Sequence, residues 1–419
     1  MGQTVIEKII AAHAGRKAVH PGEIVWIDLD VRSARDFGGA NVVGHLRRHF
    51  GAQPVADPRR TAFTFDCVVP ANTIPYAENQ HTCRSFARET GVGLYDVDAG
   101  IGSHVMIEQG LALPGTTVVG TDSHLNLLGA VGCFGQGMGD TDIAFGFATG
   151  RTWFEVPETI RVDVRGELRP PATAKDLTLA LVGQLGSKGA LGQAVELYGE
   201  AVDKLTLAER VTLCSMATEM GAIVALVRPS PEVLAFLSRR AGHPVAAPAW
   251  ADEGAGYART EVLEIDRLRP MISLPGSPSK VVSVADVAGT PVDSVFVGSC
   301  TNGRLHDFAQ LARGLRGRRV APGVMAKAVP ATREVMTALL EQGLVEALHA
   351  AGVIVSNAGC GGCASGQIGM TGKGEVQIST SNRNFRGKQG MGETYLASPL
   401  TAAVSAAAGR ITEPRRADA

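Results

Sequence analysis

Three cysteines in the last third of the chain have the surroundings and spacing of metal ligands. Cys300 follows an apolar run at 294–297 that predicts a buried strand, and Cys360 and Cys363 follow a second such run at 352–356. We expect the two strands to be neighbours in a parallel sheet, so that the three thiols meet where open α/β sheets bind ligands. Thiolates favour zinc or iron–sulfur clusters. Structural zinc and electron-carrying clusters usually take four protein ligands, whereas a [4Fe–4S] cluster held by three cysteines has an open iron that can act as a Lewis acid.

The pair Cys360-x-x-Cys363, taken alone, allows other interpretations. Such a pair is also typical of half a zinc site or of a redox-active dithiol. The two glycines between the cysteines argue against thioredoxin-like chemistry and favour a backbone packed closely against a bulky group. The glycine-rich stretch 357–366 therefore leaves the zinc, redox and cluster interpretations open.

Strands and helices alternate along most of the chain, which predicts an α/β fold rich in parallel sheet. Residues 229–270 show little pattern, so we place a domain boundary near 265 and expect domains at 1–160, 161–265 and 266–419. The last of these carries the three candidate ligand cysteines. Strands are predicted at 24–30, 61–69, 93–96, 116–120, 160–164 and 222–227, helices at 5–12, 40–50, 73–90, 174–185 and 207–220, and a loop at 100–104.

Composition excludes several classes of function. The 419 residues are 45% hydrophobic and 19% charged with a net charge of −1, which argues against disorder and against a nucleic-acid-binding surface. The odd number of cysteines, seven, does not suggest a disulfide framework, so we expect a cytoplasmic protein. The N-terminus lacks the pattern of a signal peptide, and no apolar run approaches the length of a membrane span. We therefore expect neither nucleic acid nor membrane as a partner.

Five motifs occur here in a fixed order, and together they resemble the aconitase superfamily. They are Gly-Thr-Asp-Ser-His at 120–124, Val-Glu-Leu-Tyr-Gly at 195–199, Ser-Cys-Thr-Asn at 299–302, Cys-x-x-Cys at 360–363 and Ser-Thr-Ser-Asn-Arg-Asn-Phe-x-Gly at 379–387. The resemblance runs from about residue 5 to 414 and is strongest to the large subunits of two-subunit hydro-lyases such as isopropylmalate isomerase, homoaconitase and dimethylmalate dehydratase. It implies three α/β domains around a central [4Fe–4S] cleft. It also implies that the fourth, swivelling domain is a separate small subunit, in a heterodimer or heterotetramer.

The resemblance also implies roles for individual residues. Cys300, Cys360 and Cys363 are similar to the cluster ligands. Asp122 and His124 resemble the group that handles the hydroxyl or water, with Glu196 as the carboxylate that orients the imidazole; a carboxylate beside a histidine makes a proton relay. Asp66 and His104 are further catalytic candidates, and the substrate-binding candidates are Ser123, Asn302, Asn382, Arg383 and Lys388. The remaining cysteines Cys83, Cys133 and Cys214 are expected to be core residues.

The chain departs from the family pattern at several of these places. The family usually has a histidine where Cys67 and Ser103 stand, with His104 one position later, and an arginine where Lys388 stands. Two hypotheses follow. In one, the chain is a divergent hydro-lyase acting on a 2- or 3-hydroxy di- or tricarboxylic acid such as isopropylmalate, homocitrate, homoaconitate or an alkylmalate, with a relay through His124 and Glu196 or through His104. In the other, it keeps the cluster but has lost hydratase chemistry and serves as a sensor or binding subunit. The family's C–H base is a serine of the swivelling domain, so we assign no base in this chain.

Overall fold

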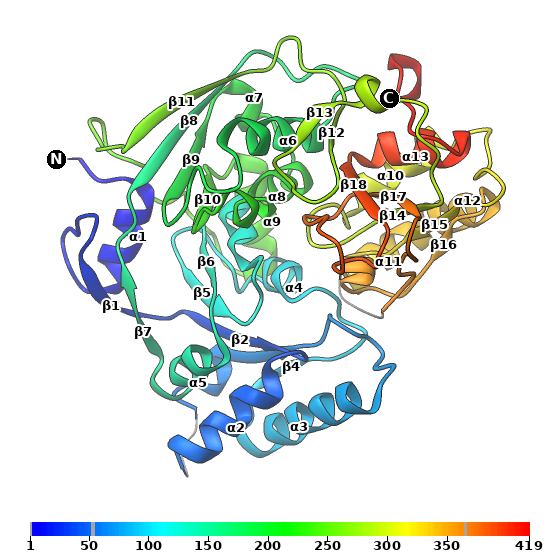
Figure 1. Ribbon diagram of the computed structural model, residues 1–419. Coiled ribbons are helices and arrows are strands. Elements are labelled where there is room, and N and C mark those ends of the chain that lie inside the picture. Colours follow the sequence, from blue (N-terminus) through cyan, green and yellow to red (C-terminus); the bar gives the residue numbers. More distant parts are fainter. Residues whose placement is uncertain (1, 52–54, 364–366) are drawn as a thin grey trace.

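The first part of the chain forms a five-stranded parallel sheet with the order β4-β3-β2-β5-β6. The computed structural model describes residues 2–51, 55–363 and 367–419. The central strand β2 lies between β3 and β5, so the carboxyl ends of these three strands are side by side at one edge (Figure 1). The strands are β2 Val31–Arg35, β3 Thr61–Thr64, β4 Gly93–Tyr95, β5 Thr117–Gly120 and β6 Phe134–Gly137, and an antiparallel ribbon joins β1 Ile24–Asp28 to β7 Arg151–Glu155.

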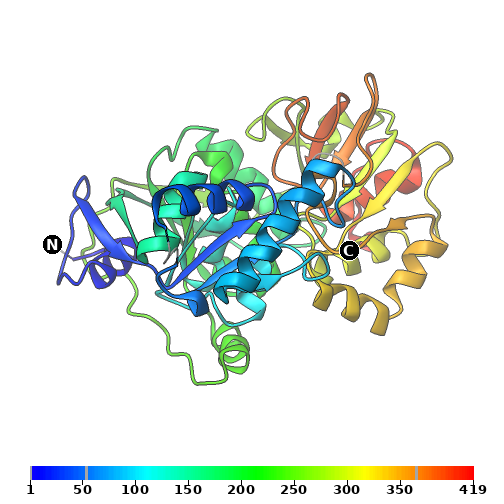
Figure 2. The ribbon, with the colours of Figure 1, turned by 90° about the horizontal axis from the view of Figure 1, so that it is seen from below.

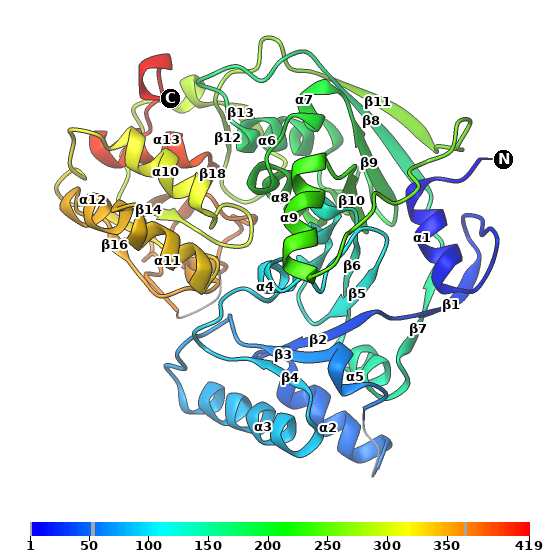
Figure 3. The ribbon, with the colours of Figure 1, turned by 180° about the vertical axis from the view of Figure 1, so that it is seen from behind.

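Helices cover this sheet and link it to the next part of the chain. The first helix begins after Thr4, whose side chain accepts a hydrogen bond from the backbone N–H of Glu7. The backbone N–H of Thr4 in turn donates to the Glu7 side chain, so the two residues form a capping box. Helices α2 and α3 pack against each other, and α4 contacts α9 (Figure 3). The helices are α1 Val5–His13, α2 Gly39–His49, α3 Ile74–Thr90, α4 Gly102–Glu108 and α5 Asp140–Thr149, with 3-10 turns η1 Pro58–Arg60 and η2 Leu125–Val131.

A four-stranded parallel sheet, ordered β10-β9-β8-β11, follows. The range 229–270, in which the sequence shows little pattern, contains α9 and β11. The end signals of α9 are present in the sequence: Ser230 caps its first turn, Pro231 begins it and Gly242 follows it with a φ of 73°. The elements are β8 Thr159–Arg165, β9 Ala194–Tyr198, β10 Val224–Val227, β11 Arg259–Glu264, α6 Ala174–Leu185, α7 Glu200–Asp203, α8 Leu207–Ser215, η3 Thr218–Met220 and α9 Pro231–Ala241.

The rest of the chain forms a seven-stranded mixed sheet ordered β13-β12-β18-β17-β14-β15-β16. Strand β12 is antiparallel to both its neighbours, and the other pairs are parallel. The strands that precede Cys300 and Cys360 are β14 and β16, and β15 lies between them, so the prediction that they are direct neighbours is wrong. The elements are β12 Met271–Ser273, β13 Val281–Ser283, β14 Ser294–Val297, β15 Met325–Ala328, β16 Ile354–Val355, β17 Val376–Ser379, β18 Glu393–Ala397, α10 Leu305–Gly314, α11 Arg333–Glu341, α12 Leu344–Ala350, α13 Pro399–Ala408, η4 Val284–Val287, η5 Gly361–Cys363 and η6 Arg416–Asp418.

Packing joins the first two sheets more closely than the third. One buried cluster combines Val31 and Val118 of the first sheet with Ile160 and Val195 of the second, whereas another is formed by residues from 272 to 411. Seen from below, the block that contains the third sheet lies to one side of the other two (Figure 2). The strands of the five-, four- and seven-stranded sheets fall within the predicted domains 1–160, 161–265 and 266–419, respectively, except that β8 begins at Thr159. The division into three domains stays a prediction. Within the described residues, no helix is both long and apolar enough to span a membrane.

A glycine sits at the contact between the first two sheets and gives a stability prediction. A Cβ on Gly129 in η2 would lie 1.7 Å from the carbonyl oxygen of Ala225 in β10. We expect Gly129→Ala to lower the free energy of unfolding by about 3 kcal/mol, because the backbone must move to admit the methyl group. Gly44→Ala in α2 is the control, since nothing lies within 4 Å of the added Cβ, and a helical alanine gains about 0.5–1 kcal/mol over glycine. Urea unfolding measures both, and a Gly129→Ala protein as stable as wild type would contradict the tight contact.

Candidate active site

An arginine and two aspartates meet at the carboxyl edge of the first sheet. Arg35 ends β2, Asp66 follows β3 and Asp122 follows β5, so the strand order places them together. Arg35 Nε donates to Asp66 Oδ1 over 2.6 Å and Nη1 to Asp122 Oδ1 over 3.0 Å. Its Nη2 lies 2.7 Å from the sulfur of Cys360. Asp66 and Asp122 are predicted catalytic residues, whereas Arg35 was not predicted from the sequence.

The charges of Arg35, Asp66 and Asp122 shift one another's pKa values. Burial lowers the pKa of Arg35, but the attraction of Asp122 and Asp66 outweighs it and raises that pKa well above the ordinary value. Burial raises the pKa of Asp66 to about 6 although Arg35 opposes the shift. Burial also acts to raise the pKa of Asp122, yet Arg35 and His124 bring it below the ordinary value. The guanidinium is therefore always charged, and Asp122 is its most firmly ionised partner.

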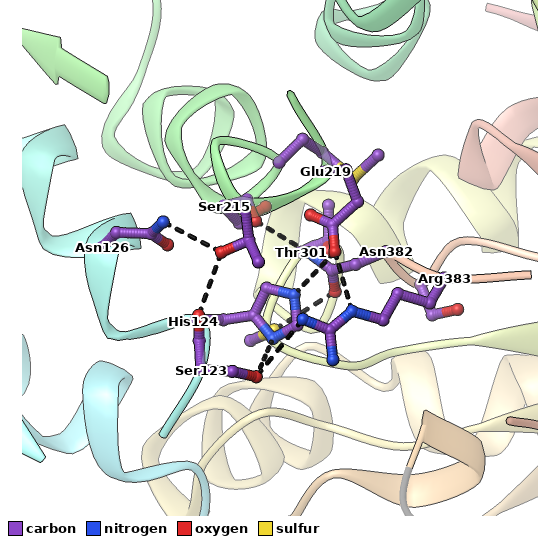
Figure 4. A network of polar contacts seen from close by, with 12 residues as sticks. Ser123, His124, Asn126, Ser215, Glu219, Thr301, Asn382 and Arg383 are labelled. Carbon is purple, nitrogen blue, oxygen red and sulfur yellow. Dashed lines mark hydrogen bonds and ion pairs between the residues drawn. The ribbon is translucent and has the colours of Figure 1, made fainter. Parts of the chain in front are cut away.

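His124 is paired with a carboxylate that the sequence analysis did not select. His124 Nε2 lies 3.0 Å from Glu219 Oε1, and Arg383 Nε donates to the same oxygen over 3.0 Å (Figure 4). The other oxygen of Glu219 is buried and has no hydrogen-bond partner among the described residues. Burial acts to raise the pKa of Glu219, but His124 and Arg383 lower it below the ordinary value. On the other side of the ring, Ser123 Oγ lies 3.4 Å from His124 Nδ1.

The predicted partnership of Glu196 with His124 is wrong. Glu196 Oε1 accepts from the backbone N–H of Val5 over 2.6 Å, and Oε2 accepts from Tyr198 over 2.6 Å and Tyr257 over 2.9 Å. Glu196 therefore holds the start of α1. A sequence signal for the true partner exists, because Glu219 is the only charged residue in the apolar stretch 213–227, and a buried acid in such a stretch needs a counter-charge.

His104 occupies a different place from the one its candidate role requires. Residues 102–108 form α4, which begins inside the loop predicted at 100–104, so His104 lies in a helix. Its Nε2 lies 2.9 Å from the carbonyl oxygen of Cys300, and Arg304 Nη1 lies 3.1 Å from Nδ1. Burial, together with the charge of Arg304, lowers the pKa of His104 to about 3. The ring is thus neutral and bonded to neighbours other than His124 and Glu219, which supports a role in holding the Cys300 backbone.

The three candidate ligand cysteines are buried at the edge of the third sheet that faces these residues. Cys300 Sγ donates to Asn382 Oδ1 over 3.3 Å. The backbone N–H of Cys360 donates to the carbonyl of Asp66 over 2.9 Å, so the loop that carries it is fastened to the first sheet. Burial raises the pKa of Cys300 well above the ordinary thiol value and also raises that of Cys363, although the charge of Lys388 opposes the second shift. Residues 364–366 of the glycine-rich stretch 357–366 lie outside the described residues.

The distances between these sulfur atoms bear on whether the site suits a single zinc ion or a larger group. Within the described ranges, the one set of three or more potential ligands whose atoms all lie within 4.8 Å of one another is Asp36, Asp66 and Cys67. The three candidate sulfurs do not form such a set, so at least one pair of them is more than 4.8 Å apart, whereas sulfurs 2.3 Å from the metal in a tetrahedral zinc site lie about 3.8 Å from each other. A four-iron cluster, which is wider than a single ion, fits this donor set. All seven cysteines are unpaired.

The substrate-binding candidates lie in three different surroundings. Arg383 and Ser123 lie beside the His124–Glu219 pair, with Arg383 Nη2 3.5 Å from Ser123 Oγ. Asn382 is fully buried and donates from Nδ2 to the carbonyl of Ser215 over 2.9 Å. Asn302 is also buried and donates to Asp307 Oδ1 over 2.8 Å, which ties it to α10. Lys388 is half-buried and acts on Cys363 through its charge.

Comparison with known proteins decides the family. The family model described as Aconitase family (aconitate hydratase) matches residues 7–409. The chain belongs to the aconitase family. A probable 3-isopropylmalate dehydratase large subunit of Methanothermobacter thermautotrophicus is 42% identical over 421 residues, 99% of each chain. The 3-isopropylmalate dehydratase large subunit 1 of Methanopyrus kandleri is 41% identical over 99% of each chain, and a probable methanogen homoaconitase large subunit of Methanosarcina mazei is 42% identical over 93% of this chain and 99% of that protein.

These relatives confirm the aconitase resemblance and the α/β fold class that the sequence predicted. Their names describe large subunits of hydro-lyases, and none supports the alternative of a sensor or binding subunit. Cys67 stands where the aconitase resemblance led us to expect a histidine. Cys67 is buried, its sulfur lies 3.5 Å from Asp66 Oδ1, and a hydrogen bond with Cys360, together with burial, raises its pKa well above the ordinary value. The charge on Asp66 is balanced by Arg35 instead.

Proposed function

We propose that this chain is the large subunit of a cytoplasmic iron–sulfur hydro-lyase that dehydrates and hydrates a 2- or 3-hydroxy di- or tricarboxylic acid of the isopropylmalate, homocitrate, homoaconitate or alkylmalate class. The observation that carries the proposal is the position of a buried candidate ligand thiol beside the His124–Glu219–Arg383 group: the Cys300 sulfur donates a hydrogen bond to Asn382, which directly precedes Arg383. The names of relatives about 40% identical over nearly the whole chain support the same reaction class. Seven unpaired cysteines support a reducing compartment.

Cys300, Cys360 and Cys363 would hold the [4Fe–4S] cluster. When bound, the cluster would supply an open iron that acts as a Lewis acid on the substrate hydroxyl. Buried groups contact two of these ligands: Asn382 accepts a hydrogen bond from the Cys300 sulfur, and Arg35 donates one to the Cys360 sulfur. Such contacts fix ligand orientation and exclude water.

The His124–Glu219 pair is suited to moving a proton at the hydroxyl. Glu219 Oε1 fixes His124 through Nε2, and Nδ1 is then available on the side where the exposed Ser123 lies. A negatively charged Glu219 stabilises the protonated imidazole, which can give a proton to the departing hydroxyl and take one from water in the reverse direction. Arg383 extends its second nitrogen toward Ser123 and is placed to bind a substrate carboxylate.

The C–H base is expected on a partner. We propose a separate small subunit that supplies the swivelling domain, in a heterodimer or a heterotetramer. Support comes from the relatives, which are named as large subunits and are covered by this chain almost to their full length. The partner would close over the edge where the thiols and His124 meet.

The experiment is to assay the chain alone and co-expressed with the small subunit encoded in the same genome. Both preparations are purified anaerobically and given isopropylmalate, homocitrate, homoaconitate, citraconate and alkylmalates, and formation or loss of the unsaturated acid is followed by ultraviolet absorbance. We expect turnover of at least one acid with both subunits, and little or none with the chain alone. Cluster-loaded protein that turns over no acid with its partner present would contradict the proposed reaction.

A further inference from the structure

Arg35 makes a contact that the proposed reaction does not by itself require. A guanidinium has five N–H donors, and the ion pairs with Asp66 and Asp122 use Nε and Nη1. The third nitrogen, Nη2, lies 2.7 Å from the sulfur of Cys360, which is one of the three candidate cluster ligands. The side chain is only 15% exposed, so water does not weaken these contacts much.

The fold brings Arg35 to this sulfur from another part of the chain. Arg35 is the last residue of β2, in the middle of the first sheet, whereas Cys360 follows β16 at the edge of the third sheet. Cys360 is held there at two points: its backbone N–H donates to the carbonyl of Asp66, and its sulfur accepts from Arg35. The position of this thiol is therefore set by the first sheet.

We propose that Arg35 is a positioning residue for the cluster, holding Cys360 through a charge-assisted N–H···S hydrogen bond and drawing negative charge from its sulfur. This inference rests on the proposed function only in taking Cys360 as a cluster ligand. Groups that hydrogen-bond to metal ligands fix their orientation, and losing one commonly costs about 10–100-fold in metal affinity. Hydrogen bonds to the sulfurs of a cluster also set its reduction potential, because they stabilise the more negative state. Arg35 thus retains iron and makes the cluster easier to reduce.

A purely structural role for Arg35 is the competing explanation. In that case the ion pairs with Asp66 and Asp122 would hold the sheet edge, and the sulfur would be a bystander. A structural role predicts lower stability when Arg35 is replaced, but no change in the reduction potential of a cluster that has formed. The potential therefore separates the two explanations.

The test compares Arg35→Gln and Arg35→Lys with Arg32→Gln in the co-expressed enzyme. Arg32 is a matched control on the same strand, since it is buried and its guanidinium donates to the carbonyls of Leu29 and Asp57 and to the hydroxyl of Thr61, which belong to none of the candidate cluster ligands. The readouts are the rate at which the reconstituted cluster loses iron to a ferrous chelator and its midpoint potential from a titration followed by electron paramagnetic resonance. We expect Arg35→Gln to lose iron about 10–100-fold faster and to have a more negative midpoint. Arg35→Lys should fall between Arg35→Gln and wild type, and Arg32→Gln should match wild type in both readouts.

Each result decides the inference. Wild-type iron loss and midpoint in Arg35→Gln would overturn it, as would equal changes in Arg35→Gln and Arg32→Gln. If Arg35→Gln does not fold, Arg35→Lys decides, because lysine keeps the charge beside Asp66 and Asp122 but cannot contact all three partners from one planar group; wild-type behaviour of that variant would overturn the inference. A wild-type protein that takes up no iron and sulfide would overturn the proposed cofactor and this inference together, whereas a loaded wild type with unaffected Arg35 variants would overturn this inference alone.

Discussion

Replacing Glu219 with glutamine lowers the turnover number of the two-subunit enzyme by about 10²–10⁴-fold, the range associated with loss of general acid–base catalysis. Glu219 Oε1 contacts both His124 and Arg383, and the carboxylate is buried. An uncharged amide no longer stabilises the protonated imidazole, and it offers only one acceptor oxygen. Because Arg383 loses its counter-charge but keeps its own charge, we expect KM to change much less than turnover. Steady-state kinetics on the preferred hydroxy acid measures both.

The matched control for Glu219 is Glu196, the other glutamate considered for the same role. Glu196→Gln removes a buried carboxylate that contacts Val5, Tyr198 and Tyr257 and lies away from His124. We expect it to lower the temperature of unfolding and to leave the turnover number close to wild type. The reverse pattern, with loss of turnover in Glu196→Gln and retention in Glu219→Gln, would contradict the site described above.

Replacing Cys300 with serine removes turnover to below detection and bleaches the visible absorption of the cluster. Cys300 is one of only three thiols proposed to hold the cluster, and a serine hydroxyl is a poor ligand for iron that prefers thiolate. Its neighbour Asn382, which accepts from the Cys300 sulfur, would keep its bond to the carbonyl of Ser215. Folding should therefore persist, as circular dichroism can check.

Cys214 is the control for this substitution. It is buried in α8, burial raises the pKa of its thiol to about 12, and it is predicted to be a core residue and not one of the three cluster ligands. Cys214→Ser should keep both the visible absorption and the turnover. Equal losses in the two variants would mean that the absorption depends on general packing and not on Cys300 as a ligand.

Local patterns predicted part of the fold, and the central strand β2 was not among the predicted strands. Predicted helices at 5–12, 40–50 and 73–90 correspond to α1, α2 and α3, and predicted strands at 93–96 and 160–164 correspond to β4 and β8. The errors lie where the local signal was weak or short. The helix α4 has only seven residues and begins at a glycine, and its first three residues lie in the range 100–104 that was expected to be a loop. Strand β11 lies at a sheet edge and has the charged residues Arg259 and Glu261 at partly buried positions and Val262 at an exposed one, which is why its range showed little pattern.

The site was predictable as a set of candidates but not as a set of contacts. His124 could be selected from its motif, yet its partner could not, since Glu196 and Glu219 are both buried acids and only the packing of η3 against the loop after β5 brings Glu219 to the imidazole. Arg35 was missed for a similar reason. Its position matters only because β2 lies between β3 and β5, and strand order is a property of the whole sheet that periodicity does not encode.

Chemical analysis of metal and sulfide in the anaerobically purified wild-type protein tests the central claim most directly. The account predicts about four iron atoms and about four acid-labile sulfides per chain and no stoichiometric zinc. One zinc per chain, or a protein that retains neither iron nor sulfide after reconstitution, would show that Cys300, Cys360 and Cys363 do not hold an iron–sulfur cluster.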